Sequence, residues 1–298
     1  MPMPGFRARQ STLPLAANQP KRQRQIGKRL LRNKRVLVGG LIVLVICALA
    51  VAAPLVTRHA PNFGNYSLIL TAPTDDNFFG TDGFGRDVFS RVIYGLRISM
   101  MVAFMSVLPA VAIGVPLGLI AGYKSGIVDN LIMRPLDLLI SFPPILLAIT
   151  LVAMFGTRLS ITIASLTLIW MPIMTRILRG SVLSVRNAEF VEAARTIGAS
   201  PARVTISHVL PNSLGPLVVQ ASISMGISIL IEASLSFVGL GTQPPDPSLG
   251  GMLAENKDFM RAAPWSVIYP GISIMVVVLG FNLFGDGLRD IVASRRRR

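Results

Sequence analysis

A single carboxylate interrupts a long apolar stretch of this chain. Glu232 lies within residues 214–238, where no other side chain carries a charge. An ionisable group inside a bilayer is costly, so it marks a candidate functional site. Glu232 could face a substrate path or bind an amine. It could equally pair with another chain or lie at the membrane surface, and the residues alone leave these alternatives open.

A second group of charges lies in residues 80–87, "GTDGFGRD". Asp82 and Asp87 could hold a cation, but Arg86 between them makes the group a poor cation cage. The alternative is a capped turn, in which Asp82 caps a helix start and Arg86 pairs with an acid. We favour the capped turn, so we predict no metal site here.

The residue types that enzymes use for catalysis are scarce or badly spaced. The chain has one cysteine and two histidines, which excludes an internal disulfide framework and a cysteine-based metal site. The sequence "GYKS" at 122–125 lacks the spacing of a phosphate-binding loop, and "GLG" at 239–241 follows no strand. No Ser/His/Asp set and no pair of acids is placed for hydrolysis. We therefore predict that this chain has no catalytic residue, metal or cofactor and hydrolyses no ATP.

The elements that position these groups are predicted to be membrane helices. Of the 298 residues, 52% are hydrophobic and 14% are charged, whereas soluble domains carry about 25% charged residues. Six apolar segments reach the length of about 20 residues that crosses a hydrocarbon core. They are residues 36–56, 98–122, 131–155, 160–178, 214–238 and 267–284. The chain is therefore predicted to be an all-α integral membrane protein with six transmembrane helices.

The third apolar segment, residues 131–155, is the least regular of the six. It contains Arg134, Asp137 and the pair Pro143-Pro144. Transmembrane helices tolerate proline where neighbouring groups satisfy the freed carbonyls, so we expect a kink at the prolines. Asp137 follows Arg134 by one turn, which favours a structural ion pair between them or a contact with the 189–212 region.

The basic residues predict the orientation. With the N-terminus in the cytoplasm, 21 lysines and arginines fall on the inside and seven on the outside. The positive-inside rule therefore places both termini in the cytoplasm. The basic tails are expected to attract anionic lipid rather than nucleic acid.

The same pattern divides the chain. We expect a basic, largely disordered tail over 1–35, the first helix at 36–56, an external loop at 57–96, a five-helix core at 97–290 and a basic tail at 291–298. A cleaved signal peptide ending at "ALAVAAP" (48–54) is the alternative for the N-terminus. The 35-residue basic region and the apolar run that follows it suit a membrane anchor better.

Residues 189–212, "EFVEAARTIGASPARVTISHVLPN", form a polar segment between the fourth and fifth spans. Asn187 can cap a first helix. Gly198 suits the left-handed residue that ends it. Ser200 and Pro201 then suit the cap and first position of a second helix, which we expect to end near Pro211. The segment is therefore predicted to be a cytoplasmic helical hairpin.

One face of the first hairpin helix has the pattern of a docking surface. Phe190, Ala193, Ala194 and Ile197 follow the i, i+3, i+4, i+7 spacing of one helical face. Alanines allow close backbone approach, and the flanking apolar groups supply burial. Such a face could dock in a groove of a soluble partner. The alternative is an amphipathic helix on the lipid surface, which the short, alanine-rich face fits less well.

The hairpin carries a resemblance to a known family. Glu192-Ala193-Ala194, then Gly198, then Leu210-Pro211, resembles the cytoplasmic signature loop of ATP-binding-cassette (ABC) importer permeases. His208 departs from that pattern, which more often has an aliphatic residue. In the family this loop contains the coupling helix, which docks on the ATP-binding subunit. The resemblance implies coupling roles for Phe190, Glu192, Ala193, Ala194, Gly198 and Pro211.

Longer stretches are similar to one branch of that family, the dipeptide, oligopeptide and nickel permeases. They are residues 79–99, 232–253 and 264–290. The lead-in at 79–99 resembles the C-type member of a permease heterodimer, and the ending "IVASRRRR" departs from the family's usual tail. Residues 241–251 are expected to form an irregular external loop that could meet a partner. Gly285 and Gly287 are expected to end the sixth span, and they could help to hold the coupling loop.

The resemblance implies a type I ABC importer permease fold, with the coupling helix between transmembrane helices 4 and 5. It implies a subunit that moves dipeptides or oligopeptides across a bacterial inner membrane, with Glu232 as a candidate pathway residue. Its implied partners are a homologous second permease, two subunits that bind ATP and Mg²⁺, and an external substrate-binding protein. Nickel and glutathione are alternative substrates. A self-contained secondary transporter is the alternative class, although we find neither an internal repeat nor an ion site of its own.

Overall fold

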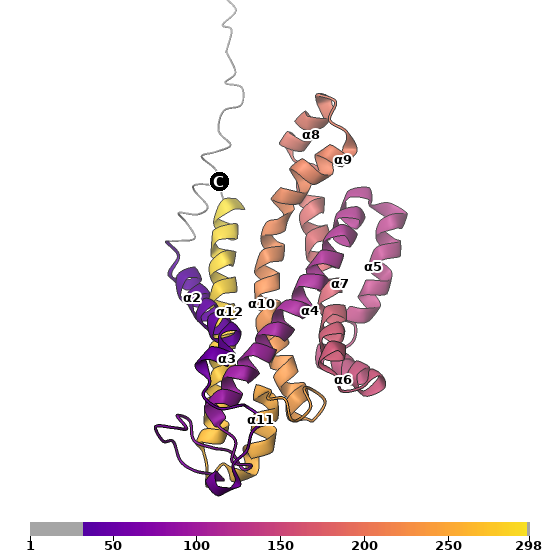
Figure 1. The fold of residues 1–298 in the computed structure, drawn as a ribbon. Coiled ribbons are helices and arrows are strands. Elements are labelled where there is room, and N and C mark those ends of the chain that lie inside the picture. Colours follow the sequence, from indigo (N-terminus) through magenta and orange to yellow (C-terminus); the bar gives the residue numbers. More distant parts are fainter. Residues whose placement is uncertain (1–31, 297–298) are drawn as a thin grey trace, which may run out of the picture.

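The computed structural model describes residues 32–296, and nearly all of its regular structure is helical (Figure 1). The first half contains α2 (Lys34–Val51), α3 (Ala53–Val56), η1 (Tyr66–Leu68), α4 (Val88–Lys124), α5 (Gly126–Ile140), α6 (Pro144–Phe155) and α7 (Leu159–Val185). The second half contains α8 (Glu189–Thr196), α9 (Pro201–Arg203), η2 (Val204–Val209), α10 (Leu210–Phe237), α11 (Leu249–Asn256), η3 (Lys257–Phe259) and α12 (Trp265–Arg296). We call the end that carries α8 and α9 the hairpin end.

The predicted six-span architecture is confirmed, with one span broken. Five helical segments are long and apolar enough to cross a membrane. The sixth is the pair α5 and α6, which meet at an angle of 87°. Because α4 and α7 both end at the hairpin end, the α5–α6 pair has to return the chain between them (Figure 1). The break falls at Ser141–Pro143, where the sequence predicted a proline kink.

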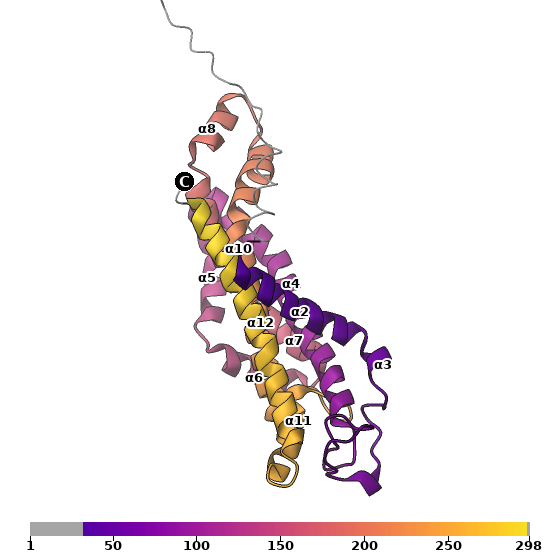
Figure 2. The same cartoon turned by 90° about the vertical axis from the view of Figure 1, so that its left-hand side faces the viewer.

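Glycines bring the long helices close together. A Cβ added at Gly118 of α4 would lie 2.6 Å from the carbonyl oxygen of Thr175 in α7. Gly114 and Gly122, one turn away on either side, also face α7 at such short range. α2 packs against α12 and crosses it at an angle (Figure 2), and a Cβ at Gly280 of α12 would lie 2.7 Å from the Ile42 side chain. Close packing of small residues is the usual basis of helix association in membranes.

The structure corrects the predicted ends of two spans. α4 begins at Val88, about ten residues before the predicted start of the second span. Residues 88–97, which include Arg91 and Arg97, continue the helix at the end of the molecule opposite the hairpin. α12 continues to Arg296 and does not end at Gly285 or Gly287. A Cβ at Gly287 would lie 2.7 Å from the backbone nitrogen of Val36. This glycine therefore permits contact with α2 and does not stop the helix.

The stretch 241–251 is only partly irregular. Ser248 caps α11 by accepting a hydrogen bond from the Gly251 backbone at 3.0 Å, so the last three residues of that stretch are helical. The expected disorder of the N-terminal tail concerns residues that lie, apart from 32–35, outside the described part of the chain.

Candidate functional site

The hairpin is present, and its first helix, α8, spans Glu189–Thr196. Ala188 is the cap residue, with extended backbone and no side-chain cap bond, so the prediction that Asn187 caps this helix was wrong. Asn187 lies one residue too early for its side chain to reach the free amides. Glu189 and Glu192 lie in the first turn, where acidic groups interact favourably with the helix dipole.

The face of α8 is rotated from the one that the sequence predicted. Val191 and Ala194 are buried in the hydrophobic cluster that also contains Val204. Phe190 and Ala193 are exposed, and Ile197, just after the helix, is 85% exposed. Ala194 therefore holds α8 against its own chain and does not lie on the outer surface. The error arose because α8 is only two turns long. Few positions define its faces, so the burial of Val191 is enough to rotate the buried face from the one predicted.

The turn that follows α8 is the one predicted. Gly198 has φ of +85°, in the left-handed region, and the Ala199 amide donates to the Ala194 carbonyl at 3.1 Å. Ser200 then caps the next helix, because its hydroxyl accepts a hydrogen bond from the Arg203 backbone. Local sequence chemistry is enough to specify such a turn.

The sequence predicted that the second hairpin helix ends near Pro211, and this prediction was wrong. α9, the π-helical segment Val204–Val209 and α10 form one continuous helical segment that enters the fifth span. Pro211 lies in the first turn of α10, directly after the wider π-helical turn, where its missing N–H breaks no regular ladder. A movement of the hairpin is therefore connected to α10 without an intervening loop.

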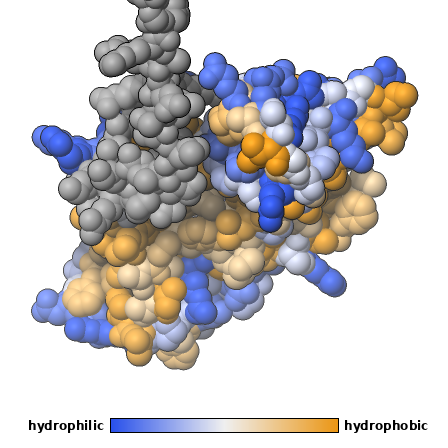
Figure 3. Space-filling view, turned by 90° about the horizontal axis from the view of Figure 1, so that it is seen from above, coloured by the Kyte–Doolittle hydropathy of each residue, from blue (hydrophilic) through white to orange (hydrophobic). Residues whose placement is uncertain are grey.

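Figure 3 looks down on the hairpin end, where hydrophilic surface surrounds small hydrophobic patches. Phe190 and Ile197 are the large exposed apolar residues of α8 and its turn. Glu189, Glu192 and Arg195 are exposed among them. A short helix that presents two apolar side chains within a charged rim suits a shallow groove on a soluble protein.

Glu232 is fully buried within this chain, between α10 and α4. The Ser236 hydroxyl donates to one carboxylate oxygen at 2.8 Å, and the Ser99 hydroxyl of α4 donates to the other at 3.4 Å. Buried polar groups need such partners. In this conformation Glu232 therefore faces α4 and does not border open space.

A network of four buried or half-buried charges lies at the end opposite the hairpin. Arg86 pairs with Asp82 at 2.7 Å and also with Glu255 of α11. Arg91 of α4 pairs with Glu255 at 3.2 Å and approaches Asp82 at 3.6 Å. The predicted pairing of Arg86 with an acid is confirmed. The cap of α4, however, is Asp87, which accepts from the Ser90 amide at 2.7 Å, and not Asp82.

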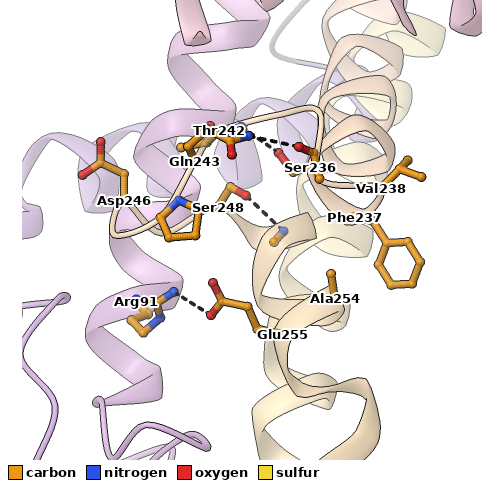
Figure 4. A pocket seen from close by; sticks show the side chains of 13 residues that line it. Arg91, Ser236, Phe237, Val238, Thr242, Gln243, Asp246, Ser248, Ala254 and Glu255 are labelled. Carbon is orange, nitrogen blue, oxygen red and sulfur yellow. Dashed lines mark hydrogen bonds and ion pairs between the residues drawn. The ribbon is translucent and has the colours of Figure 1, made fainter. Parts of the chain in front are cut away.

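Two members of this network, Arg91 and Glu255, line a pocket of about 300 Å³. Figure 4 shows Arg91 and Glu255 pointing toward each other beneath the 240–248 loop, which carries Thr242, Gln243 and Asp246. The network therefore joins the 57–87 segment, α4 and α11 under one loop. The sequence signal that could have indicated this network was the concentration of charged residues at 82–91, but the partner Glu255 is distant in the chain.

The other predicted ion pair was wrong in its partner. Asp137 pairs with Arg176 of α7 and not with Arg134 of its own helix. A second pair links the same two helices, because the Arg179 guanidinium donates twice to the Asp129 carboxylate. α5 is therefore fastened to α7 by two ion pairs. Within residues 32–296, no group of three His, Cys, Asp or Glu side chains is placed to hold a metal ion.

These observations define a class: a multi-pass, all-helical membrane protein with a helical hairpin between its fourth and fifth spans. Residues 114–298 match the family described as "Binding-protein-dependent transport system inner membrane component". Residues 23–73 match the "N-terminal TM domain of oligopeptide transport permease C". The chain belongs to this family of ABC importer permeases and is a permease subunit of the C type.

Similar proteins cover most of the chain. It is 45% identical to the "Dipeptide transport system permease protein DppC" of Alkalihalophilus pseudofirmus, over 92% of this chain and 90% of that protein. It is 40% identical to the "Glutathione transport system permease protein GsiD" of Pectobacterium atrosepticum, over 94% of each chain. It is 37% identical to the DppC protein of Haemophilus influenzae, over 90% of this chain and 92% of that protein.

A solved structure shares the fold. The permease chain in "Inward facing conformations of the MetNI methionine ABC transporter" superposes with a TM-score of 0.55 at 20% identity. The match covers 67% of this chain and 96% of that chain. The type I importer permease fold is therefore confirmed.

Proposed function

We propose that this chain is the C-type half of a permease heterodimer that imports peptides across a bacterial inner membrane. The second half is a homologous permease, and two separate subunits bind and hydrolyse ATP with Mg²⁺. An external substrate-binding protein delivers the peptide. The observation that carries the proposal is the α8–α9 hairpin, which presents Phe190, Ala193 and Ile197 outside the membrane-spanning bundle.

The mechanism follows from the connection of the hairpin to α10. ATP binding draws the two ATP-binding subunits together, and each carries its docked hairpin with it. Because α9, η2 and α10 form one helical segment, this displacement tilts α10 and opens the path outward. Hydrolysis then reverses the movement, which is alternating access driven by rigid docking.

The orientation is part of the proposal. In Figure 1, α12 ends on the hairpin side of the molecule, and α2 begins there. The surplus of basic residues over 1–35 and after residue 288 then falls in the cytoplasm, as the positive-inside rule requires. The charged network and the 240–248 loop face outward, where this loop could meet the substrate-binding protein.

Peptides are the proposed substrate because relatives named for dipeptide transport cover about nine-tenths of the chain. Glutathione is the second candidate, favoured by the relative that is 40% identical. Glu232 is proposed as a pathway residue only for a conformation in which α10 has moved away from α4. In the present arrangement its carboxylate is enclosed by Ser99 and Ser236.

Crosslinking tests the docking proposal. We expect a cysteine introduced as Ala193→Cys to crosslink to an ATP-binding subunit in native membranes, because Ala193 is exposed on α8. The matched control is Ala194→Cys, one residue away but only 6% exposed, which should crosslink several-fold less. The native Cys47 is replaced first. Equal crosslinking at both positions, or none at position 193, would contradict the docking face. Uptake of a labelled dipeptide, with glutathione as competitor, separates the two substrates.

Gly198→Val tests the hairpin turn. No described atom lies within 4 Å of a Cβ at this position, so within this chain the substitution acts through backbone strain and not through a clash. A β-branched residue in the left-handed region costs about 1–2 kcal/mol or more, and we expect transport per ATP hydrolysed to fall. Gly198→Asn is the control, because asparagine tolerates this conformation, and it should retain transport. Normal transport in the valine variant would refute this account of the turn.

A further inference from the structure

Arg186 lies at the junction between α7 and the hairpin, and its side chain reaches across to α4. It is the residue that ends α7. Its Nη1 donates to the Gly122 carbonyl at 2.9 Å and to the Tyr123 carbonyl at 3.4 Å. The same nitrogen contacts the Ser125 hydroxyl. One guanidinium therefore holds the last turn of α4 directly beneath the hairpin.

These contacts have a clear electrostatic basis. The last four carbonyls of a helix lack partners within the helix, and they carry the negative end of its dipole. Arginine is always charged and offers several donors in a fixed geometry. A cation at this position is therefore bound more strongly than a neutral donor would be. Arg186 is half-buried, so solvent only partly competes for these carbonyls.

A second contact reaches the same turn from the hairpin itself. The Arg195 guanidinium of α8 lies 5.9 Å from the centre of the Tyr123 ring. The distance is at the outer limit of a cation–π interaction. Tyr123 also packs against the hydrophobic cluster that contains Val191 and Ala194 of α8. The hairpin thus contacts the last turn of α4 at Tyr123.

The end of α4 is in turn part of a tightly packed unit. A Cβ at Gly122 would lie 2.8 Å from the Val182 side chain and 3.0 Å from the Arg179 carbonyl oxygen of α7. α5 is joined to α7 by the Arg179–Asp129 pair. Packed interfaces of this kind shift as units and deform little. A force applied at the last turn of α4 would therefore move α4, α5 and α7 together.

We propose that Arg186 is a positioning residue that fastens the last turn of α4 to the junction between α7 and the hairpin, so that α4 and the α5 that follows it move with the ATP-binding subunits along with α7 and α10. The proposal rests on the proposed function of the hairpin and adds a second mechanical connection to it. Without Arg186, the hairpin still docks through its exposed face and still pulls α7 and α10, which continue from its two ends. The α4 side then follows incompletely, and ATP is hydrolysed without transport.

The test is Arg186→Met in the complete transporter, reconstituted with its ATP-binding subunits and binding protein. We expect transport per ATP hydrolysed to fall about tenfold, as for the loss of one charge-assisted hydrogen bond. Crosslinking through Ala193→Cys should stay at its normal level, because docking does not involve Arg186. Arg186→Lys should recover most of the ratio, since an ammonium can donate to the same carbonyls.

Arg35→Met is the matched control. It removes a cation from the same end of the molecule, in an exposed pair with Asp290, and should leave the ratio unchanged. An unchanged ratio in Arg186→Met, or an equal fall in Arg35→Met, would overturn the proposal. If Arg186→Met fails to accumulate, Ser125→Ala is the variant that tests the proposal. It removes one acceptor of Arg186, and an unchanged ratio there would also overturn the idea. Absence of the Ala193→Cys crosslink in the transporter that retains Arg186 would instead contradict the proposed function.

Discussion

Arg91→Met is expected to destabilise the end of the chain opposite the hairpin by about 3–5 kcal/mol, the cost of removing one partner from a buried ion pair. Arg91 is 1% exposed and Asp82 is 0% exposed. Removing Arg91 leaves Asp82 and Glu255 to share Arg86, so one buried and one half-buried carboxylate face one cation. The methionine fills much of the volume but supplies no donor. The free energy of unfolding in detergent, or the yield of folded chain in membranes, measures the effect.

A double-mutant cycle separates pairing from packing. Glu255→Gln removes one of the two carboxylates, so the double variant Arg91→Met, Glu255→Gln should lose clearly less than the sum of the single losses. Arg261→Met is the control, because Arg261 is exposed at the same end, and it should change stability by less than about 0.5 kcal/mol. Additive single losses, or an effect of Arg91→Met as small as that of the control, would show that the network contributes little.

The sequence predicted what depends on local chemistry. Apolar length identified the spans, since each helix must satisfy its own backbone in lipid. The turn at Gly198 and the cap at Ser200 were also predictable, because both depend on residues within a few positions. The proline break between α5 and α6 was located for the same reason, although its angle of 87° depends on neighbouring helices.

Contacts between distant segments could not be predicted in this way. The sequence favours a pair between Asp137 and Arg134, its helical neighbour, or a contact of Asp137 with the hairpin region, whereas in the structure Asp137 pairs with Arg176 of α7. Gly287 looked like a helix stop, because only the packing of α2 against α12 shows why a side chain is missing there. Arg186 gave no signal at all. Its partners are backbone carbonyls about 60 residues earlier, and every residue type supplies those.

Gly118→Val is expected to have the second large effect, because it separates α4 from α7. A Cβ at this position would lie 2.6 Å from the Thr175 carbonyl oxygen and 3.0 Å from the Leu178 Cβ. Both neighbours belong to a helix that is itself held by ion pairs to α5, so neither can move alone. Overpacking of a close interface costs about 1–3 kcal/mol and occasionally more. Thermal unfolding of the purified chain should show the loss.

The same substitution should also reduce transport at temperatures where the chain remains folded. If α4 and α7 move as one unit, as the proposed role of Arg186 requires, a wedge between them weakens that unit as well as the fold. Gly180→Val on α7 is the matched control, because no described atom lies within 4 Å of a Cβ there. Both variants add a β-branched residue to a long helix, so the difference between them isolates the contact. If Gly180→Val proved as damaging as Gly118→Val, helix propensity and not the α4–α7 contact would account for the loss.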